Sequence, residues 1–308
     1  MTMATVLCVG HAVQDYVFSV VDLPRLAVKH QASALRRVGG GPAATAAVAV
    51  ARLGGRALLA ARVGDDAVAG EMVAELESYG VDCAYVRRLK GHRSSLSAVM
   101  VDRSGERMIV NYLDENMPTA AGWLPAPQAV GAEAVLADSR WPEGAAWSLA
   151  AARVAGIPGV LDADKPVPPE DGALRAATHV AFSAEALSDY TGIGDCVLGL
   201  RTAAARLGGW CCVTAGAEGV YVLDGGAMSH FPGHPVEVVD TLGAGDVWHG
   251  AFALALAEGA DWRDAVRFAS AAAALKVQRP GGRAGVPSRA EVEDFQRQAG
   301  MPAPRTPE

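Results

Sequence analysis

Short apolar runs alternate with amphipathic stretches along most of the chain. Helical patterns separate the runs, for instance over 43–53 and 67–79, and the last third is mainly helical, over 245–258, 262–277 and 289–299. Runs of strand length occur at 6–9, 57–63, 134–137, 159–162, 179–182 and 211–214. This alternation predicts an α/β fold, a mainly parallel Rossmann-like sheet with helices on both faces.

Two parts of the chain break the alternation. Period-two, β-branched runs at 16–21, 31–38, 95–102 and 107–112 predict four short strands, the last two joined by a hairpin turn. A sheet of this size is marginal alone, so we expect it to cover a pocket as a lid. The sequence therefore predicts one domain over 1–308, with lid strands inserted at about 12–38 and 93–115.

Composition narrows the classes of partner. The chain is 51% hydrophobic and 20% charged, with a formal net charge of −7. The absence of a Lys/Arg-dense run argues against nucleic acid or an anionic membrane as partner, but a small anion held by a few local cations stays compatible. No apolar run approaches about 18 residues, and the first ten residues lack a signal-peptide pattern. The five cysteines show no C-x-x-C pair, so we expect core cysteines and a cytoplasmic protein.

The strongest chemical signal is the run D-T-L-G-A-G-D at 240–246, which an Ala-rich helical stretch follows. Small residues at a loop-to-helix junction let backbone N–H groups approach an anion, and the helix N-terminus adds partial positive charge. Asp246 would then accept the proton of a hydroxyl that attacks phosphorus. The plainer alternative is a glycine-rich turn in which Asp246 caps the helix.

Further motifs make the sequence resemble the ribokinase-like (PfkB) family of small-molecule kinases over nearly its whole length. The family's D-T-x-G-A-G-D signature stands at 240–246, with Leu242 where Thr is usual. A double glycine opens a helix that ends in A-R-L-G, at 39–54, and R-V-G-D-D follows at 62–66. Asp15 matches the acid that holds sugar hydroxyls, and V-T-A-G-A-E-G at 213–219 resembles the nucleotide loop.

The resemblance implies a set of roles. ATP with Mg²⁺ would be the phosphoryl donor, and the enzyme would form a homodimer through the lid. The family's N-x-x-E metal motif falls on Ser183 and Ala186, so no metal ligand is assigned, although Asp164 or Glu185 could act through water. The implied site residues are Asp246 as catalytic base, Gly243, Ala244 and Gly245 as anion hole, Asp15, Gly40 and Gly41 for the sugar, and Thr214, Gly216 and Gly219 for the nucleotide.

Within the family, the sequence is most similar to the sulfofructose kinases of sulfoglycolysis. The similar stretches are 39–49, 105–112, 136–141 and 279–285, and Thr45 stands where ribokinases have Asn. The resemblance implies that Lys29, Asn111 and Arg140 hold a sulfonate, a fixed monoanion with three acceptor oxygens. Taken singly, these residues are equally typical of a solvated lysine, the closing residue of a hairpin strand, and an ion pair of Arg140 with Asp138.

We therefore expect an ATP-dependent kinase that phosphorylates the C1 hydroxyl of 6-deoxy-6-sulfofructose. The alternatives are a kinase for a sugar 6-phosphate such as fructose or tagatose 6-phosphate, another sugar kinase of the family, and a non-catalytic sugar sensor on the same fold. A dinucleotide-binding protein is disfavoured because Gly10-His11-Ala12 is not G-x-G-x-x-G. We expect His249 to pack or to hydrogen-bond, and Arg283 to lie near the nucleotide or in solvent.

Overall fold

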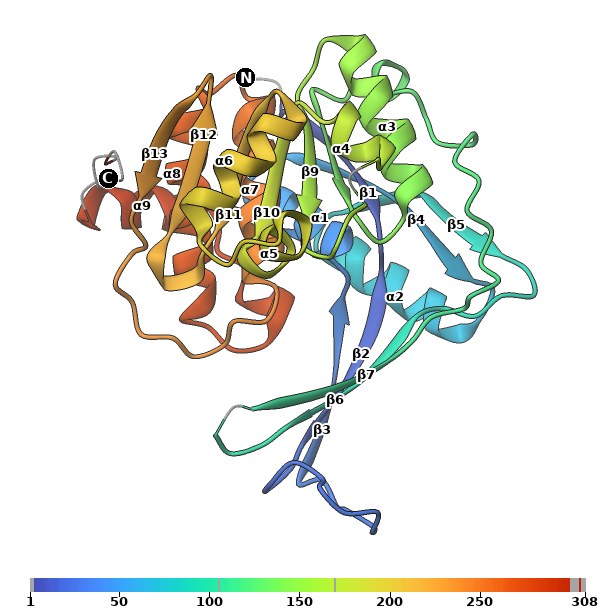
Figure 1. Ribbon diagram of the computed structural model, residues 1–308. Helices are drawn as coiled ribbons and strands as arrows, with labels where there is room; N and C mark the ends of the chain where they lie inside the picture. Colours follow the sequence, from blue (N-terminus) through green and yellow to red (C-terminus); the bar gives the residue numbers. More distant parts are fainter. Residues whose placement is uncertain (1–2, 105, 169, 300–304, 306–308) are drawn as a thin grey trace.

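The computed structural model describes residues 3–104, 106–168, 170–299 and 305 (Figure 1). Within these residues the main sheet has nine strands in the order β13-β12-β11-β10-β9-β8-β1-β4-β5. The strands from β5 to β11 are parallel to their neighbours, and β12 and β13 continue the sheet antiparallel. The strands are β1 (Thr5–Gly10), β4 (Arg56–Gly64), β5 (Asp82–Leu89), β8 (Ala134–Asp138), β9 (Gly159–Ala163), β10 (His179–Ser183), β11 (Trp210–Thr214), β12 (Val220–Asp224) and β13 (Ala227–Phe231).

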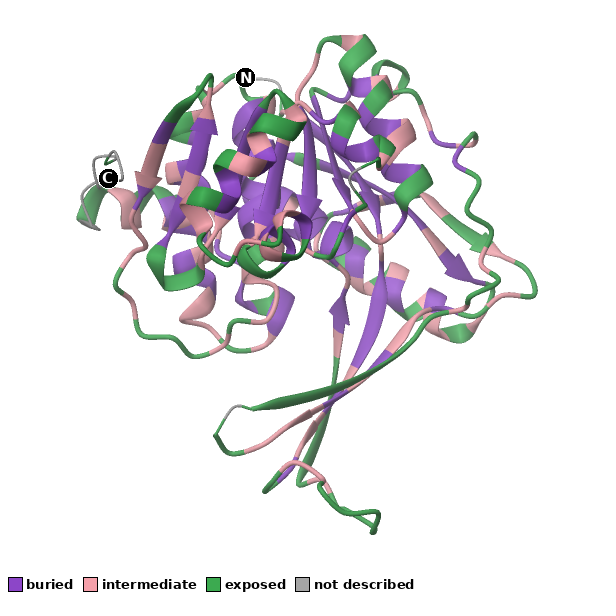
Figure 2. Ribbon diagram, viewed as in Figure 1, coloured by how far each residue is buried: buried purple, intermediate pink, exposed green. Residues whose placement is uncertain are grey.

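The predicted α/β architecture is confirmed. Every position of β1, β8 and β9 is buried, as expected for strands covered on both faces (Figure 2). The edge strand β5 was not predicted, because its alternation is interrupted by charged residues and half of it is accessible. One core cluster joins the sheet to α1 (Pro42–Arg52), α2 (Ala67–Ser78), α7 (Ala244–Ala257), α8 (Trp262–Val277) and α9 (Arg289–Ala299). The other joins it to α3 (Pro142–Ala155), α4 (Gly172–Ala176), α5 (Ala184–Thr191) and α6 (Cys196–Leu207).

Helices α1 and α7 pack closely because small residues line their contact. A Cβ on Gly250 of α7 would lie 2.5 Å from the carbonyl oxygen of Ala46 in α1. This approach brings the N-terminus of α7, which carries the glycine-rich loop, next to the start of α1, which follows the double glycine. Four of the five cysteines are buried in strands of the main sheet as free thiols, and Cys196 is half-buried.

The second sheet stands away from the core. It pairs in the order β3-β2-β6-β7, with β2 and β6 parallel and the other pairs antiparallel. These strands are β2 (Val13–Ser19), β3 (Ala34–Gly40), β6 (Leu96–Val101) and β7 (Arg107–Tyr112). The prediction that four short strands form one sheet, called the lid below, is confirmed (Figures 1 and 2). Strand β3 continues through Gly39 and Gly40, beyond the predicted end at 38, so both glycines lie in the strand rather than at the helix start.

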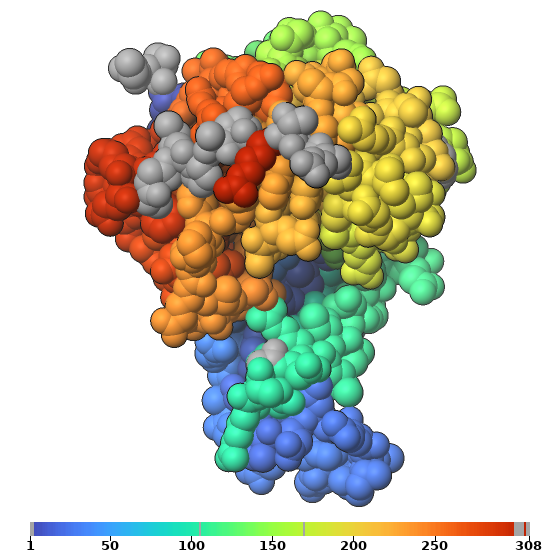
Figure 3. All heavy atoms as spheres, turned by 60° about the vertical axis from the view of Figure 1, so that its left-hand side comes forward, coloured from blue at the N-terminus to red at the C-terminus, as the bar shows by residue number. Residues whose placement is uncertain are grey.

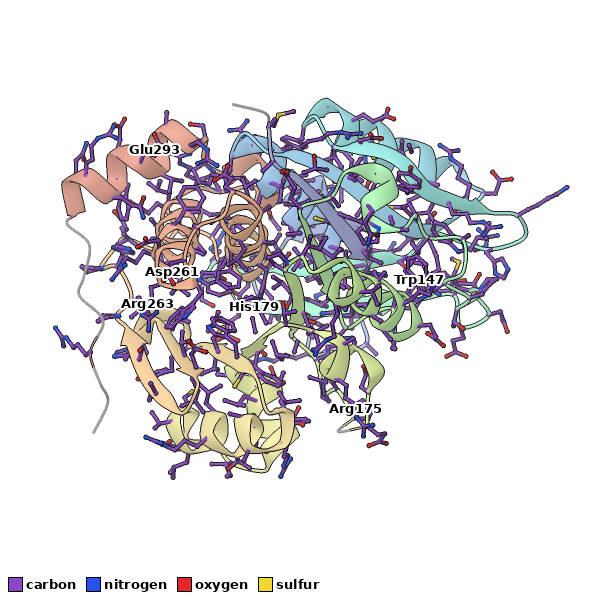
Figure 4. All side chains as sticks on the ribbon, turned by 90° about the horizontal axis from the view of Figure 1, so that it is seen from above. Trp147, Arg175, His179, Asp261, Arg263 and Glu293 are labelled. Carbon is purple, nitrogen blue, oxygen red and sulfur yellow. The ribbon has the colours of Figure 1, made fainter. Side chains whose placement is uncertain are left out.

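The lid and the carboxyl ends of the parallel strands lie at the same end of the molecule. Figure 4 views the opposite end, where His179 at the start of β10 lies near the centre of the molecule. Its ring packs 4.9 Å from Trp210 and 5.7 Å from Phe252, measured between ring centroids, which fills that end with aromatic side chains. At the lid end, Figure 3 shows a recess between lid and core. Open α/β sheets bind ligands at the carboxyl ends of their strands, so this recess is the expected ligand site.

No helix among the residues the structure describes has the length and apolar character needed to cross a membrane.

Candidate active site

The glycine-rich loop turns sharply into α7. Gly243 adopts φ 76°, a left-handed conformation, and is the N-cap of the helix without any side-chain cap bond. Asp246 is therefore the third residue of α7 and does not cap it, which removes the plainer interpretation of the motif. The Ala244 N–H donates to the Thr241 carbonyl at 3.2 Å, so this predicted anion-hole amide has an internal acceptor here.

The carboxyl of Asp246 has an unusually high pKa. Burial raises its pKa from 3.8 to about 7, and the negative charges of Asp164 and Asp138 add to the rise. The positive charges of Arg140 and Arg283 oppose it. A carboxyl that ionises near neutral pH is suited to receive a proton from an alcohol during catalysis.

Asp240, at the start of the same loop, had no role in the sequence interpretation beyond membership of the motif. Its carboxylate accepts the N–H of Leu242 at 2.9 Å, of Gly281 at 3.0 Å and of Gly282 at 3.3 Å. Burial raises its pKa, but the Leu242 N–H and the Lys276 ammonium bring it below 3.8 overall. Asp240 is therefore a charged anchor that shapes the anion-hole loop, residues 240–245.

The predicted sugar-binding residues meet at the start of the lid. Asp15 on β2 is 7% exposed, and burial raises its pKa. Its carboxylate lies so close to Gly40 that a Cβ there would be 2.4 Å from Oδ2. Gly41 has φ 95°, and a Cβ on it would lie 2.4 Å from the carbonyl oxygen of His11. A side chain at either position would displace these neighbours, so both positions favour glycine.

Asp138 joins three segments of this site. One carboxylate oxygen accepts the N–H of His11 at 2.7 Å and of Ala43 at 3.0 Å, and the other accepts the Arg140 N–H at 2.9 Å. Asp138 thus ties the ends of β1 and β8 to the start of α1. The sequence offered only one hint of this role, an acid that ends a buried strand.

Arg283 corrects the sequence expectation. It is 1% exposed, so it is not a solvated loop residue, and its contacts are on the sugar side rather than with the nucleotide loop. Its guanidinium donates to the Gly40 carbonyl at 2.6 Å, to Glu75 at 2.7 Å and to Thr45 Oγ1 at 3.3 Å. Arg283 therefore holds the double glycine in place from behind.

The structure separates the three predicted sulfonate ligands. Arg140 follows β8 and pairs with Asp164, not with Asp138, whose contact is to the Arg140 backbone. Asn111 is exposed on β7, opposite Ser97, which in turn lies opposite Asp15. Lys29 is exposed in the loop between β2 and β3, beyond the end of β2 that is far from Asp15.

The predicted nucleotide residues lie at the carboxyl end of β11. Thr214 ends this strand and donates to the Phe182 carbonyl at 3.3 Å. The turn that follows is closed by the Ala215 N–H, which donates to the Gly219 carbonyl at 2.8 Å. Gly216 and Gly219 have φ 54° and 97°. The turn lies at the same edge of the sheet as Asp246.

One departure from the family pattern, at Ser183, has a structural counterpart. Ser183 Oγ accepts the Ala186 N–H at 3.1 Å, so Ser183 is a helix cap where the family has the Asn of its metal motif. His249 is buried, with Nδ1 3.4 Å from Asp162 Oδ2, and burial lowers its pKa to about 4. Among the described residues, no group of three or more His, Cys, Asp or Glu is arranged to hold a metal ion.

Comparison with known proteins decides the family. Residues 3–289 match the model of the pfkB family of carbohydrate kinases. The chain belongs to this family. Ribokinase from Bacillus subtilis is 30% identical to this pfkB-family kinase over 296 residues, covering 95% of this chain and 99% of the relative. Fructokinase from Klebsiella pneumoniae is 34% identical over 234 residues, covering 68% of this chain and 74% of the relative.

Solved structures agree. A candidate ribokinase from Agrobacterium tumefaciens has a TM-score of 0.91 and 39% identity, covering 96% of this pfkB-family kinase and 98% of that chain. Arabidopsis thaliana ribokinase in complex with ribose and ATP has a TM-score of 0.84 and 28% identity, covering 96% and 99%. These matches confirm the predicted ribokinase-like fold and the predicted enzyme class, a carbohydrate kinase. The sulfofructose substrate stays a prediction.

Proposed function

We propose that this kinase transfers the γ-phosphoryl group of ATP to the C1 hydroxyl of 6-deoxy-6-sulfofructose. The observation that carries the proposal is a convergence at one edge of the sheet. The carboxyl of Asp246 lies in the first turn of α7, within the electrostatic reach of Arg140. Arg283, which donates to the Gly40 carbonyl, interacts with the charges of both Asp246 and Asp15.

In this proposal the chain's own groups carry out the chemical step. Asp15 orients the sugar, and Asp246 takes the proton as the C1 oxygen attacks the γ-phosphorus. The new O–P bond forms as the bond between the γ-phosphorus and the bridging oxygen breaks, and ADP leaves. Backbone N–H groups of Gly243 and Gly245 and the N-terminus of α7 stabilise the charge on the transferring group.

The nucleotide is expected against residues 214–219, because this turn resembles the nucleotide loop of the family. Mg²⁺, when bound, would neutralise charge on the donor phosphates. A metal held mainly by nucleotide phosphates fits a chain whose described residues contain no ready cluster of metal ligands. No protein ligand for the metal is assigned.

The charges around His11 support an anionic sugar. Burial lowers the pKa of His11 to about 4, and the nearby cations Arg140, Arg62 and Lys165 contribute to that shift. Arg62 stacks on Trp141 at 4.4 Å from the ring centroid and donates to a backbone carbonyl. Because Arg140 is already paired with Asp164, the remaining positive charge suits a sulfonate monoanion better than a phosphate dianion.

The test compares steady-state kcat/KM for 6-deoxy-6-sulfofructose, fructose 6-phosphate and fructose, with phosphorus NMR to locate the new ester at C1. We expect the sulfonate sugar to be preferred by at least about tenfold. Equal or higher efficiency with fructose 6-phosphate would replace the proposal by its nearest rival. Absence of sugar-dependent ATP consumption with every sugar would favour the non-catalytic sensor.

We also propose that the enzyme is a homodimer through the lid. The lid face formed by Leu35, Met108, Val110 and Tyr112 is exposed and apolar, and β7 and β3 are unpaired edges. Edges of this kind favour pairing with a second copy. Light scattering on the wild type and on the variant Val110→Lys tests this, with a monomer expected for the variant only.

A further inference from the structure

Arg107 connects the lid directly to the anion-hole loop. It is the first residue of β7, and its side chain is 31% exposed. Its guanidinium donates to Asp240 Oδ1 at 3.0 Å, across 133 positions of sequence. A charged hydrogen bond therefore joins the lid to the anion-hole loop, in addition to the cover over the sugar that the proposed function gives the lid.

The partner of Arg107 is the anchor of the loop. The oxygen that Arg107 contacts, Asp240 Oδ1, also accepts the Leu242 N–H, and Leu242 immediately precedes Gly243. The other oxygen accepts the N–H groups of Gly281 and Gly282. Any rotation of the Asp240 carboxylate therefore moves the loop that ends at the α7 N-terminus.

A second cation holds Asp240 from the core side. Lys276 of α8 is fully buried, and its Nζ lies 2.8 Å from the Asp240 carbonyl oxygen and 3.7 Å from Oδ2. Lys276 is fixed in the core and neutralises the carboxylate whatever the lid does. Arg107 lies on the lid, so its contact with Asp240 depends on the position of the lid.

We propose that Arg107 is a positioning residue that links the seated lid to the shape of the anion hole through Asp240. The proposal rests on the function proposed above for residues 243–246. In this arrangement Gly281, Gly282 and Lys276 hold the Asp240 carboxylate from the core side, and Arg107 holds it from the lid. Phosphoryl transfer would then be fastest only when the lid covers the sugar, which limits wasteful transfer to water.

The chain supplies a matched control. Arg37 on β3 pairs with Glu71 on α2, so it is also a lid-to-core ion pair, but it does not contact the anion-hole loop. The variants Arg107→Met and Arg37→Met each remove one cation from the lid. Only Arg107→Met removes a contact to Asp240, and Arg107→Lys restores the charge without the fork of the guanidinium.

Kinetics provide the first readout. Misplacing a catalytic group by about 1 Å costs up to about 100-fold in rate, so we expect Arg107→Met to lower kcat by about 10- to 100-fold. The Kd for ATP should change less than about twofold, and Arg107→Lys should recover part of kcat. Arg37→Met should keep kcat within about twofold. Equal losses in the Arg107→Met and Arg37→Met variants would mean a general lid effect and would overturn the proposal.

Hydrogen exchange provides a readout that needs no turnover. We expect the amides of Leu242, Gly281 and Gly282 to exchange about tenfold faster in Arg107→Met than in the wild type, and to be unchanged in Arg37→Met. Unchanged exchange in Arg107→Met overturns the coupling, whatever the kinetics. If the wild type phosphorylates no sugar while the exchange difference is present, the proposed function fails and the link from the lid to Asp240 stands.

Discussion

Replacing Asp246 by Asn separates catalysis from stability, because the structure predicts that this carboxyl harms the folded state at neutral pH. Its pKa is about 7 in the folded enzyme against an ordinary value of 3.8, mainly because of burial. When the pKa of an acid is higher in the folded than in the unfolded state, the folded state is relatively more stable at low pH. This stability is lost as pH rises from about 4 through about 7. The neutral Asn carries no such penalty.

The size of the effect follows from the two pKa values. Ionising Asp246 costs the fold ~4 kcal/mol at about pH 8 and ~2 kcal/mol at about pH 5. The side chain is partly exposed, so solvent reduces these figures, and we expect the stability gain of Asp246→Asn to grow by ~1–2 kcal/mol between the two pH values. Loss of the base should lower kcat by about 100-fold or more.

The assay is urea unfolding of the wild type and Asp246→Asn, without ligands, at about pH 5 and about pH 8. The exposed Asp22 in the lid loop supplies the control variant Asp22→Asn, which removes a carboxylate outside the site. Asp246→Asn should be inactive and more stable than the wild type at the higher pH. A stability gain of Asp246→Asn that is equal at both pH values would refute the reasoning. It would show that ionisation of the Asp246 carboxyl does not destabilise the folded enzyme.

Four other predictions follow from the site. The kcat/KM of the wild type should rise about tenfold per pH unit below about pH 7 and then level off, because Asp246 must be ionised to act as base. Gly40→Ala should raise the sugar KM at least about tenfold with an unchanged Kd for ATP, since its Cβ would lie 2.4 Å from Asp15 Oδ2. Arg140→Met should lower kcat/KM for an anionic sugar about 10- to 100-fold more than for fructose. Arg283→Met should lower the free energy of unfolding by about 3–5 kcal/mol in urea titrations, because it removes the buried cation that pairs with Glu75 Oε2 and bonds the Gly40 carbonyl.

Each of these has a result that would contradict it. A pH profile flat between about pH 5 and about pH 8 would remove Asp246 as the titrating base. Gly122→Ala, where the added Cβ meets nothing within 4 Å, is the control for Gly40→Ala, and similar KM values in both would argue against the sugar site. Equal losses on both sugars in Arg140→Met would place Arg140 outside anion recognition. A loss below about 1 kcal/mol in Arg283→Met would show that the guanidinium network is dispensable.

The local pattern of apolar and polar residues predicted most of the fold. The apolar runs predicted six of the nine strands in the described main sheet, and period-two runs predicted the lid, because burial of one or both faces leaves its period in the sequence. The strands β5, β12 and β13 were missed. β5 and β13 are the two edges of the described main sheet, where accessible positions weaken the apolar pattern, and β12 is a short strand that lies next to β13. The glycines at 40, 41 and 243 could be identified in advance because backbone close to a ligand, or with positive φ, requires glycine.

By itself, the sequence determined the family and the fold and predicted the residues of the anion-hole loop, since these depend on short motifs in a fixed order. Only the tertiary structure decided which distant charges meet. It buried Arg283 behind the double glycine, paired Arg140 with Asp164, left Lys29 exposed, and brought Arg107 of the lid to Asp240. The physical reason is that a charged side chain looks the same in sequence whether it is solvated or paired. Its partner is set by tertiary packing, which brings together positions that lie 24 residues apart for Arg140 and Asp164 and 243 residues apart for Arg283 and Gly40.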